Sequence, residues 1–166
     1  MNSGQIYYAI TGQRGFLKLA GEIRYPLAAS LNQAVNTLLA APEIQGVVVD
    51  LQETDFIDST CLGLLARVAT QKPRTQRERP VIVSTHADIN QLLETMGFDH
   101  AFVLLHSSGV AATDFGRTTE PAGTAAGPDR QLILDAHRAL CDLNEKNRQL
   151  FRNVIDLLDE ENGDSK

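Results

Sequence analysis

Apolar positions along the first part of the chain follow two kinds of pattern, one typical of strands and one typical of helices. Residues 47–49 are consecutive valines, a run typical of a parallel strand that is covered on both faces. After a polar connection, Phe56 and Ile57 are expected to point back toward the core. Residues 59–70 then carry leucines and a valine at helical spacing, which predicts an amphipathic helix. These stretches together predict a buried central strand followed by a helix that packs on it.

The same strand and helix patterns predict the remaining elements of an α/β domain. Alternation on either side of a glycine-containing turn at 12–15 predicts a pair of strands. The expected strands lie at residues 5–11, 15–20, 47–49, 81–84 and 101–105, and the expected helices at 27–39, 59–70 and 89–96. Asp88 is expected to cap the last helix and Gly97 to end it. The order β-β-α-β-α-β-α-β predicts a mostly parallel β-sheet with crossover helices.

Composition divides the chain into three parts. Residues 1–106 carry all of the elements above and are expected to form one domain. Residues 107–128 are rich in Gly, Ala, Thr, Ser and Pro, which predicts a flexible linker. Residues 129–162 return to helical spacing and predict a long amphipathic C-terminal helix.

The predicted C-terminal helix has a heptad pattern of apolar positions. Its two core positions hold Ile133, Ala136, Leu140, Leu143, Asn147, Leu150, Val154 and Leu157. This pattern, with one buried Asn, is typical of a two-stranded parallel coiled coil. Phe151, Ile155 and Leu158 widen the apolar stripe, which instead favours packing on a globular body. Three alternatives stay open: a homodimer, packing on the chain's own domain, and binding to a partner protein.

A short polar run, Asp58-Ser59-Thr60, lies at the start of the helix predicted at 59–70. A side-chain oxygen in this place commonly accepts a hydrogen bond from an unpaired backbone N–H, so Asp58 or Ser59 is expected to cap the helix. The same helix start carries a partial positive charge that suits a phosphate. A phosphoserine here would place about −1.5 to −2 charges beside Asp58 and near Asp55. The run is therefore both a candidate cap and a candidate phosphorylation site.

Charge and motif content argue against several classes of function. The formal net charge of −6 argues against a nucleic-acid partner, since such surfaces are normally basic. No apolar run is long enough for a membrane span and the first residues do not resemble a signal peptide, so we expect a cytoplasmic protein with protein partners and no membrane association. Cys61, Cys141 and the histidines lack metal-ligand spacing, and no glycine-rich phosphate loop is present. We therefore expect no enzyme activity, no metal and no cofactor.

One run resembles the signature of the STAS-domain anti-sigma factor antagonists: Phe56-Ile57-Asp58-Ser59-Thr60-Cys61-Leu62-Gly63. In that family an Asp-Ser-Ser/Thr-Gly-Leu-Gly run begins a helix after a strand, and the serine that follows the aspartate is phosphorylated. The resemblance implies that Ser59 is the phosphoacceptor, with Asp58, Thr60, Cys61, Leu62 and Gly63 as its neighbours. Cys61 stands where the family usually has glycine, so a side chain occupies a position that is otherwise bare.

The resemblance also implies the STAS fold and a set of partners. An anti-sigma factor or a kinase-type regulator would bind while Ser59 is unphosphorylated, a serine kinase would end that contact, and a PP2C-type phosphatase would restore it. The surface that contacts the partner is expected to include Glu22, Ile23, Arg24, Tyr25 and Asp55. For Tyr25 the alternative is a half-buried core aromatic. The alternative function is a constitutive scaffold that oligomerises or binds a partner through the C-terminal helix.

Part of the C-terminal pattern is similar to a smaller bacterial group of STAS proteins. The similar runs are Ala136-His137-Arg138-Ala139-Leu140 and Leu143-Asn144-Glu145-Lys146-Asn147. In that group a helix of this kind follows the STAS domain. The group is linked to the control of motility versus biofilm growth, and the resemblance implies a role of the same kind.

Overall fold

A computed structural model describes the backbone of residues 3–106 and 129–163. The segment predicted as a flexible linker, 107–128, lies outside the described residues. Within them, a five-stranded sheet has the strand order β1-β2-β3-β4-β5. The strands are β1 (Gln5–Thr11), β2 (Arg14–Ile23), β3 (Gly46–Ile57), β4 (Val81–Val83) and β5 (Val103–Leu105). β1 and β2 pair antiparallel and all other pairs are parallel, which confirms the predicted α/β class with a mostly parallel sheet.

The valine run occupies the centre of the sheet, as predicted, because β3 has two strands on either side. β3 is longer than the sequence suggested. The expected polar connection after the valines is part of the strand, which continues to Ile57. Ile57 is buried as expected, whereas Phe56 is 39% exposed, so its predicted inward orientation is wrong. The two side chains alternate because successive residues of a strand point to opposite faces.

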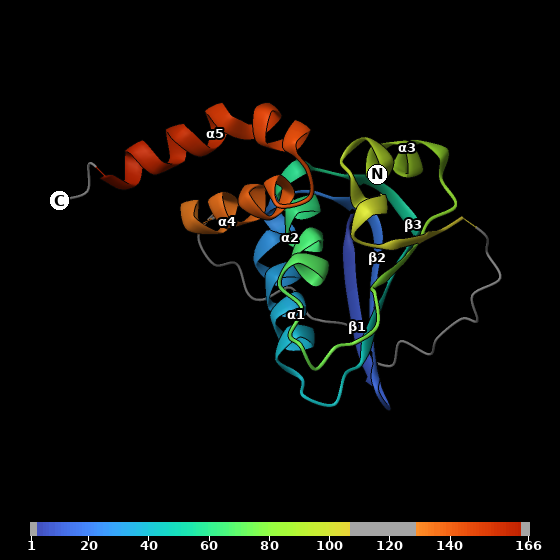
Figure 1. The fold of residues 1–166 in the computed structure, drawn as a ribbon. Coiled ribbons are helices and arrows are strands. Elements are labelled where there is room, and N and C mark those ends of the chain that lie inside the picture. Colours follow the sequence, from blue (N-terminus) through green and yellow to red (C-terminus); the bar gives the residue numbers. More distant parts are fainter. Residues whose placement is uncertain (1–2, 107–128, 164–166) are drawn as a thin grey trace.

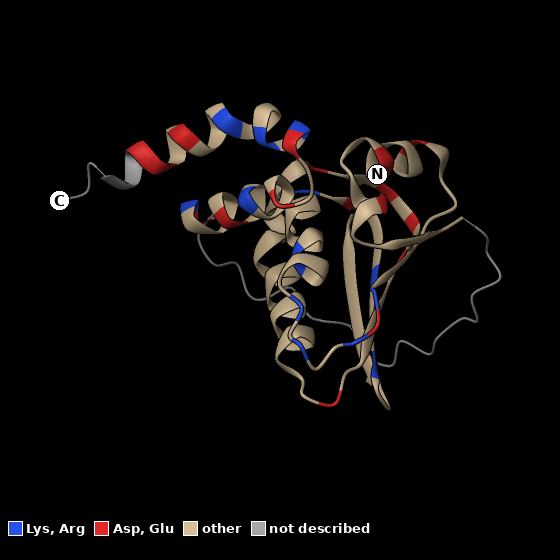
Figure 2. Cartoon of the chain, viewed as in Figure 1, with Lys and Arg blue, Asp and Glu red and all other residues tan. Residues whose placement is uncertain are grey.

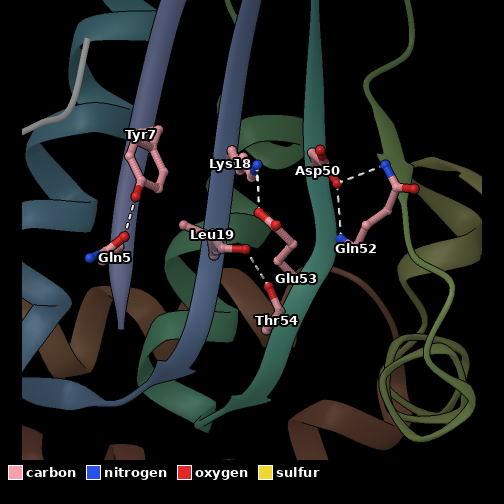
Figure 3. Close-up of polar contacts among 8 residues, drawn as sticks. All are labelled: Gln5, Tyr7, Lys18, Leu19, Asp50, Gln52, Glu53 and Thr54. Atoms are coloured by element: carbon pink, nitrogen blue, oxygen red, sulfur yellow. Dashed lines mark hydrogen bonds and ion pairs between the residues drawn. The ribbon is translucent and has the colours of Figure 1, made fainter. Parts of the chain in front are cut away.

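Side chains also fix how β2 lies on β3, as Figure 3 shows. The pairing register shifts between Lys18 and Ala20. At this irregularity, the buried Thr54 hydroxyl donates to the Leu19 carbonyl oxygen at 2.8 Å, and Lys18 Nζ lies 2.5 Å from Glu53 Oε2. The hydrogen bond to Glu53 raises the pKa of Lys18 above its usual value. These contacts align the ends of β2 and β3, from which the segment before Ser59 leaves the sheet.

Three helices accompany the sheet. They are α1 (Ala28–Ala40), α2 (Ser59–Thr70) and α3 (Ala87–Thr95), and a 3-10 turn, η1 (Tyr25–Leu27), leads into α1. α1 and α2 lie side by side against one face of the sheet (Figure 1). α3 begins one residue before Asp88, whose side chain makes no cap, so that prediction is wrong. Gly97 has the left-handed φ of 80° expected of a residue that ends a helix.

The C-terminal segment is helical, but the prediction of one long helix is wrong. α4 (Arg130–Cys141) and α5 (Glu145–Gly163) are separated by a turn at residues 142–144. The second helix starts because Asn144 Oδ1 accepts the backbone N–H of Asn147 at 2.8 Å, the geometry of an N-terminal cap. The two helices form an α4–α5 hairpin, and the second half of α5 extends away from the rest of the molecule (Figure 1).

Because the segment forms two helices, the eight predicted coiled-coil positions differ in how far they are buried. Ala136, Leu140 and Asn147 are buried within the chain itself, and Ile133 and Leu143 are half-buried. Leu150, Val154 and Leu157 are exposed. A continuous parallel coiled coil through all eight residues is therefore wrong for this fold. Of the three alternatives, packing on the chain's own domain is what the structure shows for α4.

Candidate functional site

Ser59 is the first residue of α2 and follows directly on the sheet. The backbone N–H of Asp58 donates to the Ile23 carbonyl oxygen at 3.0 Å, which ties the start of the helix to the end of β2. Asp58 Oδ1 then accepts the backbone N–H of Cys61 at 2.9 Å. Asp58 therefore caps α2, which confirms one of the two residues predicted for that role. The Ser59 hydroxyl is left for another partner.

That partner is a histidine 78 positions further along the chain. The Ser59 Oγ lies 3.2 Å from His137 Nε2. His137 Nδ1 lies 2.7 Å from the Ile133 carbonyl oxygen, which can only accept, so Nδ1 carries a hydrogen. In the neutral imidazole Nε2 is then an acceptor, and the Ser59 hydroxyl donates to it. The His137 side chain is only 4% exposed and meets the ring of Phe151 edge-on at 5.2 Å between centroids.

The residues after Ser59 are buried. Thr60 is 8% exposed, Cys61 0% and Leu62 1%. Burial raises the pKa of the Cys61 thiol well above its usual range, with a smaller contribution from the nearby Asp58 carboxylate. The side chain that replaces the family's usual glycine therefore lies inside the protein and does not project toward a partner. Ser59, which is half-buried, is the more accessible of the two hydroxyl residues in the run.

Gly63 lies one helical turn after Ser59 and directly beneath α4. A Cβ atom at Gly63 would stand 2.1 Å from the Ala136 carbonyl oxygen. Such a distance is far below van der Waals contact, so α4 can approach α2 this closely only because position 63 has no side chain. Ser59 and Gly63 share one face of α2, and neighbouring residues of α4 cover both.

Near the ends of β2 and β3, the region around Ser59 is exposed and partly aromatic. Tyr25 is 52% exposed and Phe56 39% exposed, and the Arg24 guanidinium lies 4.2 Å from the centroid of the Phe56 ring. Glu22 pairs with Arg24, at 3.3 Å from Oε2 to Nε. The pairing of β2 with β3 brings Glu22 beside Phe56 at the end of the sheet where Asp58 follows.

This exposed cluster changes the set of residues predicted to contact a partner. Ile23 is 0% exposed and lies in the core, so its assignment to the contact surface is wrong. Tyr25 is not a half-buried core aromatic. Asp55 is exposed on β3. Phe56 is part of this exposed cluster, which the sequence did not indicate because polar residues hide the alternation in the second half of β3.

Other kinds of site have less support. Among residues 3–106 and 129–163, no group of His, Cys, Asp or Glu is placed to hold a metal ion. No helix of this described part is long and apolar enough to cross a membrane. The Ser59 and His137 pair has a serine donor and an imidazole acceptor, as in nucleophilic catalysis, but the Nδ1 partner is a helix carbonyl and the ring is enclosed by Phe151.

Comparison with known proteins decides the family. A family model described as "Mlab, STAS domain" matches residues 6–106. The chain belongs to the STAS-domain family. The matched residues cover all five strands, except for the first residue of β1, together with α1, α2 and α3, and the α4–α5 hairpin lies beyond the match. No curated protein matched the sequence.

Solved structures share the STAS fold at low sequence identity. An anti-sigma factor antagonist from Mycobacterium paratuberculosis aligns with a TM-score of 0.56 and 21% identity, over 64% of this chain and 88% of that one. The unphosphorylated form of the anti-sigma factor antagonist SpoIIAA aligns with a TM-score of 0.49 and 14% identity, over 64% of this chain and 90% of its own. The likeness to the Mycobacterium paratuberculosis protein supports the fold alone.

Proposed function

We propose that the chain is an anti-sigma factor antagonist that works by partner switching at Ser59. The observation that carries the proposal is the placement of the Asp58-Ser59-Thr60 run at the start of α2 in a STAS domain. Asp58 provides the cap, so the Ser59 hydroxyl has no role in starting the helix. Thr60 is buried, which leaves Ser59 as the acceptor in this run.

Phosphorylation would alter this region mainly through charge. The γ-phosphoryl group of a nucleoside triphosphate moves to Ser59 Oγ, the nucleoside diphosphate leaves, and the hydroxyl proton passes to a base of the serine kinase. The product carries about −1.5 to −2 charges next to the Asp58 carboxylate. A partner that contacts this face must desolvate the new charge, so its affinity falls. A PP2C-type phosphatase restores the hydroxyl by hydrolysis.

The exposed cluster beside Ser59 supplies contacts for the unphosphorylated state. Tyr25 and Phe56 provide apolar area and Arg24 a charged group, and aromatic and arginine residues are enriched at the centres of protein interfaces. We assign the anti-sigma factor to this surface. The role places the chain in the cytoplasm, and control of motility versus biofilm growth stays a prediction.

The test compares full-length Ser59→Ala and Ser59→Asp. The partner is first captured from the native cells by cross-linking to Ser59→Ala and identified, and its affinity for each variant is then measured by calorimetry. We expect Ser59→Ala to bind, and Ser59→Asp to bind about ten- to a hundredfold more weakly, because it places a charge in the interface.

The matched control is Thr75→Asp, which adds the same charge at an exposed position in the loop after α2, beyond the end of the helix opposite Ser59. It should bind like the unsubstituted chain. Equal affinity of Ser59→Ala and Ser59→Asp would contradict the switch. A loss caused equally by Thr75→Asp would show that net charge alone weakens the complex.

A second candidate function, a scaffold that dimerises, has one observation in its favour. Leu150, Val154 and Leu157 form an exposed apolar stripe on α5. Figure 2 shows acidic residues gathered in the second half of this helix, whereas the first half carries basic residues and the acidic Glu145. The apolar stripe alone would hold such a dimer, because Arg152 and Asp156 are each two positions from Val154 and therefore face away from it. Light scattering should then show a dimer that Val154→Glu converts to a monomer, and a monomeric unsubstituted chain would eliminate this candidate.

A further inference from the structure

The α4–α5 hairpin lies on the part of α2 that carries Ser59. Residues 60–66 of α2 are all buried, although a helix that only covers a sheet exposes its outer face. The outer face is closed by α4, with Ala136 over Gly63 and His137 beside Ser59. The hairpin therefore covers the face of α2 on which Ser59 lies and leaves open the cluster of Arg24, Tyr25 and Phe56.

A second set of contacts fixes the hairpin at its turn. Asn147 is 1% exposed, and its Nδ2 donates to the carbonyl oxygens of Met96 and Leu140, both at 2.8 Å. One of these acceptors belongs to the STAS domain and the other to α4. A Cβ atom at Gly97 would stand 2.2 Å from Asn144 Nδ2, so the turn also fits closely against the end of α3. The hairpin is thus docked by specific contacts at two separate places.

We propose that the α4–α5 hairpin is an internal competitor for the Ser59 face. In the closed chain described above, it covers this face. The hairpin must leave α2 before a kinase can phosphorylate Ser59, or before a protein partner on the exposed cluster can extend its contact to Ser59 and the outer face of α2. This inference rests on the proposed function of Ser59 and adds a regulatory state to it.

The geometry at Ser59 explains why a phosphoryl group and the closed hairpin exclude each other. Only 3.2 Å separates Ser59 Oγ from His137 Nε2, so no phosphorus atom with its oxygens fits between them. The phosphate ester also has no hydroxyl hydrogen left to donate to Nε2. Closing the hairpin over the ester would remove part of its charge from water beside the Asp58 carboxylate, which is costly. Phosphorylated chains are therefore held open.

Hydrogen exchange of the full chain tests this without knowledge of the partner. Ser59→phosphoserine is installed during translation, and peptides from α2, α3, α4 and β3 are followed by mass spectrometry. Since an isolated helix as short as α4 is marginal in water, its exchange should accelerate by about tenfold or more once it leaves α2. Exchange in β3 should stay unchanged, which shows that the STAS domain remains folded.

Thr75→phosphoserine is the matched control and should leave exchange in α4 unchanged. Leu140→Asp gives the open state independently, because Leu140 is 0% exposed and a buried carboxylate would expel α4. Leu157→Asp, at a position 61% exposed, should keep the hairpin closed. Unchanged α4 exchange in Ser59→phosphoserine would overturn the proposal, since the closed hairpin would then accommodate the phosphate.

The exchange result and the partner-binding result can fail separately. If Ser59→phosphoserine opens the hairpin while Ser59→Ala and Ser59→Asp bind the partner equally, the competition at this face holds and the switch fails. If the two variants differ in affinity while α4 exchange is unchanged, the switch holds and the competitor role fails. In the second case, Leu140→Asp should also bind the partner no more tightly than Leu157→Asp.

Discussion

The STAS domain and the α4–α5 hairpin are both well packed, but they are held in place by different means. In the STAS domain, backbone hydrogen bonds between the strands join segments far apart in the sequence. The described contacts of the hairpin with the domain include helix packing on α2, the Ser59 to His137 hydrogen bond, the Asn147 bond to Met96 and the close fit of Asn144 against Gly97. Side-chain contacts of this kind can be lost as a group while the sheet stays intact.

This difference suggests two levels of stability in one chain. Residues that fill the space between the sheet and its helices should set the free energy of global unfolding. Residues of the hairpin should set the free energy of docking. A substitution in the hairpin can then lower the free energy of global unfolding by no more than this docking free energy. The comparison is open to direct tests, because both regions contain buried leucines and a buried cysteine.

The largest expected effect comes from one substitution made in both regions. Leu65 in α2 and Leu140 in α4 are each 0% exposed. Leu65→Ala should lower the free energy of global unfolding by about 2–5 kcal/mol, through lost burial and the cavity left behind. Leu140→Ala should instead accelerate exchange in α4 and lower global stability by less, because the STAS domain persists after the hairpin leaves. Urea denaturation and hydrogen exchange measure the two quantities.

An intermediate effect is expected at Asn147, which joins the two regions. Asn147→Ala removes the two hydrogen bonds to Met96 and Leu140 and should weaken docking by about 1–3 kcal/mol. The measurement is exchange in α4, with Asn153→Ala at an exposed position of α5 as the control. If both variants exchange alike, the Asn147 hydrogen bonds do not hold the hairpin.

The smallest effect is a difference in reactivity between the two thiols. Burial raises the pKa of both Cys61 and Cys141, so little of the reactive thiolate is present at neutral pH. Both should react slowly with an aromatic disulfide reagent and rapidly in urea. Cys141 should react faster than Cys61 in the folded chain, because local opening of the hairpin is more frequent than opening of the STAS domain. Equal rates would indicate that the two regions open together.

Much of the STAS domain could be predicted from the sequence, because its signals are local. The valine run, the leucine spacing of α2 and the cap at Asp58 each depend on neighbouring residues. The place of Phe56 was missed because polar residues obscured the continuation of β3. The break before α5 has a local signal, since Asn144 followed by Glu145 is a typical helix start, but the heptad pattern continues across it and predicts one helix.

The contact on which the proposed regulation rests had no such signal. Ser59 and His137 lie 78 positions apart, and no periodicity relates them. His137 has no partner near it in the sequence, because Ser59 comes within hydrogen-bond distance only when α4 docks on α2. Gly63 matched the family signature, but only the structure shows that its missing side chain also makes room for Ala136.

The central claim is that Ser59 is the phosphorylated residue of a partner switch. The most direct test is peptide mass spectrometry of the full chain purified from its own cells under several growth conditions. The account predicts phosphate on Ser59 in part of the population, removable by phosphatase and absent from Ser59→Ala. A Ser59 peptide that stays unmodified under every condition, or phosphate found only at other residues, would contradict it.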